Sequence, residues 1–353
     1  ADIFVNAARR ENLDLLPVLG GVFTLDNTLL PWGRREPIGA ELPIWLYQRS
    51  KTTISGTIPS PNAKTVLPPM KDWERMVRAC AEHYSGKIHM WEILNESEIY
   101  LDKELYVPYL IHAYKILKKI DPGCTVVGGG LTGDFGNDIT SGLEGFLRLA
   151  GKHTDGLSFH PYGSIYEDAG RMPADMLFTR AKEALEKTGN PLPLWNTEVY
   201  YLSPKSRGGG THGVGPVFDP GYQVRRYLID AANGVEVSMM LPGRYMLTNM
   251  INDNVTGDYL GAFFANRILP GDKYVVSALF AKNMKQFQYE KTLALPGRML
   301  AYLFRKGKIR TAYLFSLSVK ENDPRIIHYP HSGNGVECRD LYDEPLTLKT
   351  GKA

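Results

Sequence analysis

Two glutamates each stand directly after a short apolar run, where a buried strand would end. Glu96 closes the run IHMWEILNE, and Glu198 closes the run LPLWNTE. Between them in the sequence, a third run, DGLSFHPYG, carries His160 and Tyr162 near its end. In a barrel of alternating strands and helices, the carboxyl ends of the strands open onto one face of the molecule. We therefore expect the three runs to deliver these four side chains to a shared site.

A pair of carboxyl groups at one site suits the hydrolysis of a glycosidic bond. One carboxylic acid gives a proton to the leaving oxygen, and one carboxylate attacks or stabilises the oxocarbenium-like centre. A separation of about 5–5.5 Å gives retention through a covalent intermediate, and a wider gap admits a water molecule and gives inversion. The like charges also raise the pKa of one member, so that an acid and a base coexist at one pH. A strand-end glutamate alone is usually solvated or salt-bridged, so the signal rests on both glutamates together with the His-Pro-Tyr run.

The chain alternates between short apolar strands and amphipathic helices over most of its length. Trp73, Val77 and Tyr84, for example, fall on one face of a helix expected at 71–86. Such alternation indicates parallel βα units. Strands are expected at 15–21, 88–96, 124–130, 155–163, 192–201 and 235–241, and further helices at 103–120, 142–152, 173–188, 221–233 and near 274–286. These six strands are two fewer than a closed eight-stranded barrel needs, and an open doubly wound sheet can also stop at six.

The sequence pattern changes near residue 290. The run MLAYLFRKGKIRTAYLFSLSV indicates two strands around a Lys-Gly-Lys turn, and no helical period follows it. We predict a (β/α) barrel domain over 1–290 and a small antiparallel β domain over 291–353. The Pro/Gly-rich segment 22–70 is too long for a neutral connection, and loops of that length are usually functional.

Three motifs carry a resemblance to a known group of enzymes. WEILNES, SFHPYG and LWNTEVY, in this order, resemble the retaining glycoside hydrolases of clan A. They are most similar to family 39, the β-xylosidase and α-L-iduronidase group, with families 5 and 51 as neighbours. The resemblance covers about residues 1–290. It implies an eight-stranded (β/α)8 TIM barrel, a C-terminal β domain and a retaining O-glycosyl hydrolase that acts on an oligosaccharide or glycoside.

Carried over position by position, the resemblance implies a role for each strand-end residue. Glu96 would be the general acid/base, and Glu198 the nucleophile that forms a glycosyl-enzyme intermediate. Asn95 would bind the sugar hydroxyl next to the reacting carbon. Tyr162 would donate a hydrogen bond to the nucleophile, and His160 would line the sugar subsite.

Three further residues are candidates for substrate binding. Trp32 lies in the loop after the first expected strand, where its aromatic face could stack on a sugar ring; otherwise such aromatics fill a core. The clan often ends its eighth strand with a tryptophan, whereas this chain has Met-Leu-Pro-Gly-Arg-Tyr, so Arg244 or Tyr245 is expected to fill that space. None of the eight histidines shows the spacing of a metal-ligand pair, and we expect no metal and no cofactor.

The chain departs from the clan at its beginning. Residues 3–12 are similar to the second barrel helix and 15–21 to the third strand, so the first two βα units, with the arginine usual on the second strand, have no counterpart. Three explanations are open: a truncated or processed chain, a second chain that completes the barrel, or a degenerate barrel. Because an open barrel would leave strand edges unpaired, we expect something to cover the gap.

Composition excludes several broad classes. The 353 residues carry 41 basic and 38 acidic side chains in an interspersed pattern, which argues against nucleic acid as a partner. No apolar run has the roughly 18 residues of a membrane span, so no membrane is expected. The three cysteines are too few for a disulfide framework. The N-terminal residues do not resemble a signal peptide, and the location stays open between a secreted and a cytoplasmic soluble protein.

Two alternatives to a hydrolase remain. A carbohydrate-binding pseudoenzyme or scaffold could keep the barrel without turnover, which the absent arginine and tryptophan would fit. GGGLTG at 128–133 and GGGTHG at 208–213 match the dinucleotide-binding pattern. The first continues as a loop without opening a helix, and no suitably placed acidic residue follows it, which argues against nucleotide binding.

Overall fold

The computed structural model describes residues 2–20, 23–25, 52–55, 64–97, 103–132, 139–163, 172–199, 220–239, 272–296, 298–316, 337–340 and 344–346. The chain divides into two compact units. The first contains Ala1–Pro161 and Leu177–Thr197, and the second contains Tyr162–Met176 and Glu198–Ala353. The expected boundary between residues 290 and 291 stays a prediction.

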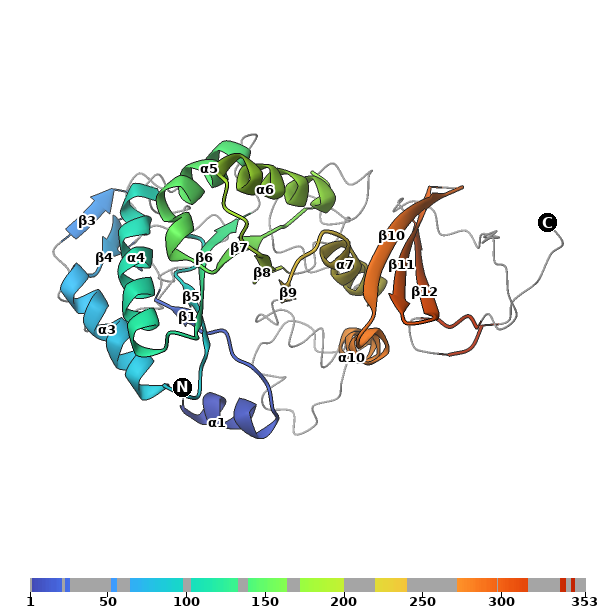
Figure 1. The fold of residues 1–353 in the computed structure, drawn as a ribbon, viewed down its shortest axis with the longest axis horizontal. Helices are drawn as coiled ribbons and strands as arrows, with labels where there is room; N and C mark the ends of the chain where they lie inside the picture. The colour runs from blue at the N-terminus through green and yellow to red at the C-terminus, as the bar shows by residue number, and fades with distance from the viewer. Residues whose placement is uncertain are drawn as a thin grey trace. The chain divides into compact units, whose positions relative to one another are not determined.

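A parallel sheet carries all six strands that the alternation predicts (Figure 1). The strands are β1 (Val18–Leu19), β5 (Met90–Ile93), β6 (Thr125–Thr132), β7 (Gly156–His160), β8 (Leu194–Asn196) and β9 (Val237–Ser238). Their order in the sheet, β1-β5-β6-β7-β8-β9, is their order along the chain. A doubly wound sheet reverses its strand order at a switch point, whereas a βα barrel does not. The order confirms the barrel class in a half-barrel form and excludes the doubly wound alternative.

One helix precedes β1, and further helices connect successive strands of this sheet, as predicted. They are α1 (Asp2–Arg10), α3 (Met70–His83), α4 (Lys103–Ile120), α5 (Ile139–Ala150), the short 3-10 helix η2 (Gly151–His153) and α6 (Ala174–Thr188). In α3 the predicted apolar stripe is buried, with Trp73 and Val77 fully inaccessible. The same spacing buries Leu110 and Leu117 on α4, and strand residues such as Val127 complete this core.

The segment expected to be a long loop contains a small antiparallel sheet. Its strands are β2 (Phe23–Leu25), β3 (Thr52–Ser55) and β4 (Lys64–Leu67), in the order β2-β4-β3. The pairing of β3 with β4 joins TTIS to KTVL, both rich in β-branched residues that favour strands. The high Pro/Gly content of segment 22–70 favoured the prediction of a loop over the strand preference of these short stretches.

The second unit combines two helices with an antiparallel sheet. These elements are α7 (Pro220–Ala232), α10 (Asp272–Met284), β10 (Gln288–Leu295), β11 (Met299–Lys306) and β12 (Ile309–Ser316). The sheet order is β10-β11-β12, so the predicted hairpin around Lys-Gly-Lys is confirmed and a third strand is added. Phe280 on α10 stacks on Tyr227 of α7 and meets Tyr313 of β12 edge to face. These aromatic contacts tie the helices to the sheet.

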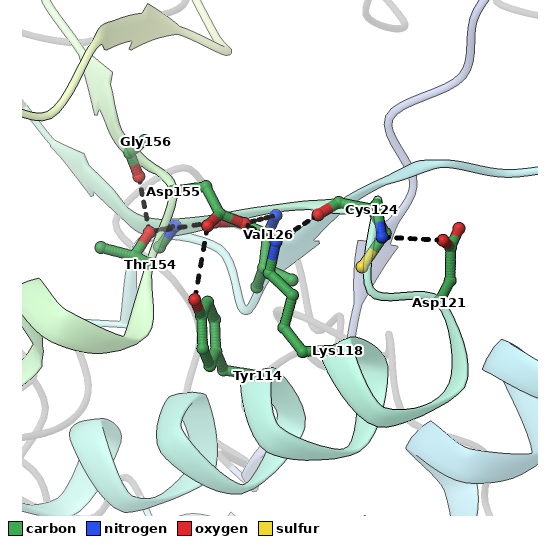
Figure 2. Close-up of polar contacts among 10 residues, drawn as sticks. Tyr114, Lys118, Asp121, Cys124, Val126, Thr154, Asp155 and Gly156 are labelled. Atoms are coloured by element: carbon green, nitrogen blue, oxygen red, sulfur yellow. Dashed lines mark hydrogen bonds and ion pairs between the residues drawn. The ribbon is translucent and has the colours of Figure 1, made fainter.

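A polar cluster of buried and half-buried side chains joins the amino ends of β6 and β7 (Figure 2). Asp155 accepts hydrogen bonds from the Val126 N–H at 2.7 Å and from Lys118 Nζ at 2.7 Å. Thr154 Oγ1 accepts from the Gly128 N–H at 2.8 Å. Burial raises the pKa of the nearby Cys124 thiol to about 11, so this thiol stays neutral and unreactive at pH 7. This end of a βα barrel serves stability, which leaves the opposite end for chemistry.

One edge of the parallel sheet is formed by β1, whose partner among the described strands is β5. Our expectation that something covers this edge stays a prediction. Among the described residues, no helix combines the length and apolar character needed to cross a bilayer.

Candidate functional site

The candidate site is built on the carboxyl ends of β5, β7 and β8. Strand β5 ends at Ile93, three residues before Glu96, and β7 ends on His160 itself. Strand β8 ends at Asn196 and is followed by Thr197. Strand β5 pairs with β6, β6 with β7, and β7 with β8, all in parallel. The carboxyl ends of these strands therefore lie at the same end of the sheet. The predicted convergence of β5 and β7 is therefore present within the first unit.

The backbone that carries Glu96 adopts an unusual conformation. Leu94 has φ 59° and Glu96 has φ 43°, both in the left-handed region that side chains other than glycine rarely adopt. The turn is held by a hydrogen bond from the Glu96 N–H to the Gly130 carbonyl at 2.8 Å. The Tyr106 hydroxyl also donates to the Ile93 carbonyl at 2.9 Å. Strained backbone of this kind is often found at functional sites.

His160 joins two strand ends through its two ring nitrogens. Nδ1 lies 2.9 Å from Glu96 Oε1, and Nε2 lies 3.2 Å from Thr197 Oγ1. The imidazole is only 1% exposed, whereas the Glu96 side chain is 21% exposed. The histidine is thus a buried support, and the carboxyl group remains accessible to a substrate.

A second carboxylate, Glu92, lies beneath this pair. It is 3% exposed and accepts a hydrogen bond from Thr197 Oγ1 at 2.8 Å. Ser158 Oγ donates a short hydrogen bond to the same Glu92 oxygen. The two hydroxyl oxygens lie 2.6 Å apart. Glu92, Ser158, Thr197, His160 and Glu96 therefore form one continuous network, which we call the strand-end network.

In the second unit, Glu198 is hydrogen-bonded to Tyr162. The Tyr162 hydroxyl donates to Glu198 Oε1 at 2.6 Å, a short distance typical of a charge-assisted hydrogen bond. The resemblance implied this contact. Both side chains are partly accessible.

The structure places some of the predicted site residues and leaves others outside its description. Asn95 lies between β5 and Glu96 and is partly exposed. Trp32, Arg244 and Tyr245 lie outside the described residues. The functional roles assigned to the site residues all stay predictions.

Sequence reasoning did not single out Ser158 and Thr197, although a signal for them existed. Ser158 stands two residues before His160, on the same face of β7, so two polar residues alternate in an otherwise apolar strand. Thr197 stands directly before Glu198. A polar residue facing inward from a fully buried strand requires a partner, and here that partner is Glu92.

The glycines of the first dinucleotide-like motif have a packing role. Gly128, Gly129 and Gly130 lie inside β6, not in a loop that opens a helix. A Cβ atom on Gly129 would lie 2.6 Å from the Ser158 carbonyl, and one on Gly130 would lie 3.0 Å from the Leu94 carbonyl. The motif allows neighbouring backbone to approach closely. The second motif, at 208–213, lies outside the described residues.

Oxygen and nitrogen atoms of the site are also of the types that bind metal ions. His160 Nδ1 and Glu96 Oε1 are hydrogen-bonded at 2.9 Å. Two ligands about 2 Å from one zinc ion at the tetrahedral angle would lie farther apart.

Solved glycoside hydrolases have similar structures. A family 39 glycoside hydrolase from the gut symbiont Bacteroides cellulosilyticus WH2 matches with a TM-score of 0.64 and 19% identity, over 99% of this chain and 66% of that chain. A glucosidase from Croceicoccus marinus matches with a TM-score of 0.51 and 13% identity, over 86% of this chain and 60% of that chain. No family model and no curated protein matches the chain.

These comparisons define the class of fold. The resemblance to clan A glycoside hydrolases that the motifs indicated is confirmed at the level of fold, including the similarity to family 39. The chain spans about two thirds of the family 39 structure and a smaller share of the glucosidase.

Proposed function

We propose that the protein is a glycoside hydrolase that cleaves glycosidic bonds with retention of configuration. Glu96 is the general acid/base and Glu198 is the nucleophile. The substrate is an oligosaccharide or glycoside, and Asn95, Trp32, Arg244 and Tyr245 are candidates for binding its sugars. Residues 1–290 form the catalytic barrel domain in this proposal, and 291–353 form the accessory β domain.

The contact pattern of His160 carries the proposal. This histidine is hydrogen-bonded to Glu96 through one nitrogen and to Thr197 through the other. Glu198 follows Thr197 by a single peptide bond. Double displacement uses two carboxyl groups, and each of the two strand ends that His160 joins is followed by one, Glu96 or Glu198. The likeness in fold to a family 39 glycoside hydrolase and to a glucosidase supports the same reaction class.

The reaction then takes two steps in which protons and bonds balance. In the first, a Glu198 oxygen attacks the anomeric carbon, the bond to the leaving oxygen breaks, and Glu96 gives its proton to that oxygen. In the second, Glu96 takes a proton from a water molecule, whose oxygen displaces Glu198 from the anomeric carbon. The Tyr162 hydroxyl holds Glu198 Oε1 and orients the carboxylate for attack.

Replacement of Glu198 tests the proposal directly. Glu198→Ala is expected to abolish turnover of aryl glycosides, because no covalent intermediate can form. In the wild-type protein, a 2-deoxy-2-fluoro glycoside with a good leaving group should label Glu198, which peptide mass spectrometry locates. NMR of the first-formed product anomer reports retention. The control is Glu186→Gln on the exposed face of α6, which should keep full activity.

Two results would overturn parts of this proposal. Full activity of Glu198→Ala on every cleaved glycoside removes the nucleophile assignment. Sugar binding by the wild-type protein without turnover of any glycoside in a broad aryl glycoside screen favours the carbohydrate-binding pseudoenzyme instead.

A further inference from the structure

We propose that Glu92 is a positioning residue that sets the protonation of the Glu96–His160 pair. Through the Thr197 hydroxyl it keeps a proton on Nε2 of His160, so that Nδ1 and Glu96 share one further proton. The placement of protons follows from the strand-end network alone. Its consequence for turnover rests on the proposed function.

The first step is to follow the proton of Thr197. A hydroxyl group donates only one hydrogen bond. Thr197 Oγ1 donates its proton to Glu92 Oε1 at 2.8 Å. If the Thr197 proton turns instead to Ser158 at 2.6 Å, it is still directed away from His160. Thr197 therefore offers His160 a lone pair.

The second step concerns Nε2 of His160. It lies 3.2 Å from Thr197 Oγ1, whose proton is already used, so this contact is a hydrogen bond only if Nε2 carries a proton. A neutral imidazole has a single N–H, and the partner of one ring nitrogen fixes the state of the other. In neutral His160, Nδ1 is consequently an acceptor.

The third step reaches Glu96. Nδ1 and Glu96 Oε1 are 2.9 Å apart, and two bare lone pairs at that distance repel. One proton must lie between them, as a carboxylic acid that donates to Nδ1 or as an imidazolium that donates to the carboxylate. In both forms the pair holds the proton that a general acid has to deliver.

Burial keeps water from replacing these contacts. Ser158 is fully inaccessible, His160 is 1% exposed and Glu92 is 3% exposed. In such surroundings an unmade hydrogen bond costs more than it does at the surface, so the proton order is strongly favoured. These three residues, Glu92, Ser158 and His160, lie on the strands β5 and β7 of the parallel sheet, which holds their backbone in place.

The order of protons has a consequence for both steps of the reaction. When Glu96 passes its proton to the leaving oxygen, lone pairs on Glu96 Oε1 and His160 Nδ1 face each other without a proton between them. The Glu96–His160 pair regains a proton from the water molecule that attacks the glycosyl-enzyme intermediate. The network thus supports Glu96 as an acid in the first step and as a base in the second.

Two substitutions at Thr197 test the proposal as a matched pair. Thr197→Val keeps the shape of the side chain and removes the hydroxyl, whereas Thr197→Ser keeps the hydroxyl. The readout is the ¹⁵N NMR spectrum of the full-length protein labelled at histidine, recorded at pH 7, with His160→Gln to assign the signals. Circular dichroism and thermal unfolding verify that each variant is folded.

In the wild-type protein and in Thr197→Ser, the spectrum should show a proton on Nε2 of His160. In Thr197→Val, this nitrogen loses its acceptor, and a mixture of tautomers should appear. The value of kcat should fall about tenfold or more with little change in KM in Thr197→Val only. If Thr197→Val does not fold, the wild-type spectrum still decides the proton position.

A wild-type His160 with a bare Nε2 overturns the proposal, as does an unchanged tautomer in folded Thr197→Val. Because the spectrum needs no substrate, its result is independent of turnover. A protein that cleaves no glycoside but shows the expected spectrum contradicts the proposed function and leaves the proton order intact.

Discussion

At the scale of single residues, the two strand-end glutamates have different partners. Glu96 meets an imidazole, a group that can both give and take a proton near neutral pH. Glu198 meets a phenol, which donates a hydrogen bond and keeps its own proton at that pH. A histidine suits a group that changes its protonation during turnover, and a tyrosine suits a carboxylate that stays ionised until it attacks. The partners match the roles that we propose.

Removal of the Tyr162 hydroxyl should reduce activity without unfolding the protein. Tyr162→Phe loses one hydrogen bond to a charged group, which contributes about 1.5–3 kcal/mol and corresponds to a roughly 10- to 100-fold lower kcat/KM. Steady-state kinetics on an aryl glycoside measures the effect. Tyr114→Phe, which removes the 3.4 Å contact with Asp155 at the amino ends of the strands, is the control and should retain activity. Equal kinetics for both variants would contradict the role of Tyr162.

At the scale of elements, strand β6 shapes the site although it supplies none of the proposed catalytic groups. Its register with β7 shifts between Gly128 and Leu131. Gly129 has φ 115° and Gly130 has φ 54° at this irregularity. The Gly130 carbonyl accepts the Glu96 N–H, so the irregularity holds the strained turn in place. A bulge next to a functional site commonly re-aims nearby side chains.

An alanine scan of two glycines should separate backbone strain from close packing. Gly86→Ala and Gly129→Ala both place a side chain at positive φ, which costs about 1–3 kcal/mol. Only Gly129→Ala adds a contact of 2.6 Å with backbone, since nothing lies within 4 Å of a Cβ at Gly86. We expect a clearly lower free energy of unfolding for Gly129→Ala in denaturant titrations. Similar losses in the two variants would show that the close approach is unimportant.

Much of the architecture could be predicted because hydrophobic period is a local property. The apolar stripe predicted the full length of α4, Lys103–Ile120. The ends of the apolar runs identified Glu96, His160 and Glu198 as candidate site residues. The left-handed turn at Glu96 could not be predicted, because tertiary hydrogen bonds select it. The partners of Glu92 could not be predicted either, because they depend on how the strands pair in the folded protein.

At the scale of the whole molecule, each of the two units has its own organising core. The first unit is centred on the parallel strands β1, β5, β6, β7 and β8 and the helices between them. In the second, α7 and α10 are joined to the antiparallel sheet through Phe280. The β10 strand begins at Gln288, so the sheet starts slightly before the boundary that the sequence predicts.

Loss of the Phe280 ring should loosen the helices and the sheet of the second unit together. Phe280→Ala removes two aromatic pairs, which contribute about 1–3 kcal/mol in total. Hydrogen exchange should become faster in both α7 and β12, while α3 and α4 keep their protection. Ile309→Ala, at a side chain that is 61% exposed on the same sheet, is the control. Faster exchange in α10 alone would mean that these elements do not open as one body.

The strand-end network also limits how such barrels can be recombined. Glu92, Ser158 and Thr197 come from three separate stretches of sequence, yet each is useful only with the other two. A chimera that imported one of those stretches from a different barrel would bury an orphaned carboxylate or hydroxyl. Exchange of genetic segments should therefore succeed when a crossover keeps residues 90–197 as one inherited block, and fail when it cuts between them.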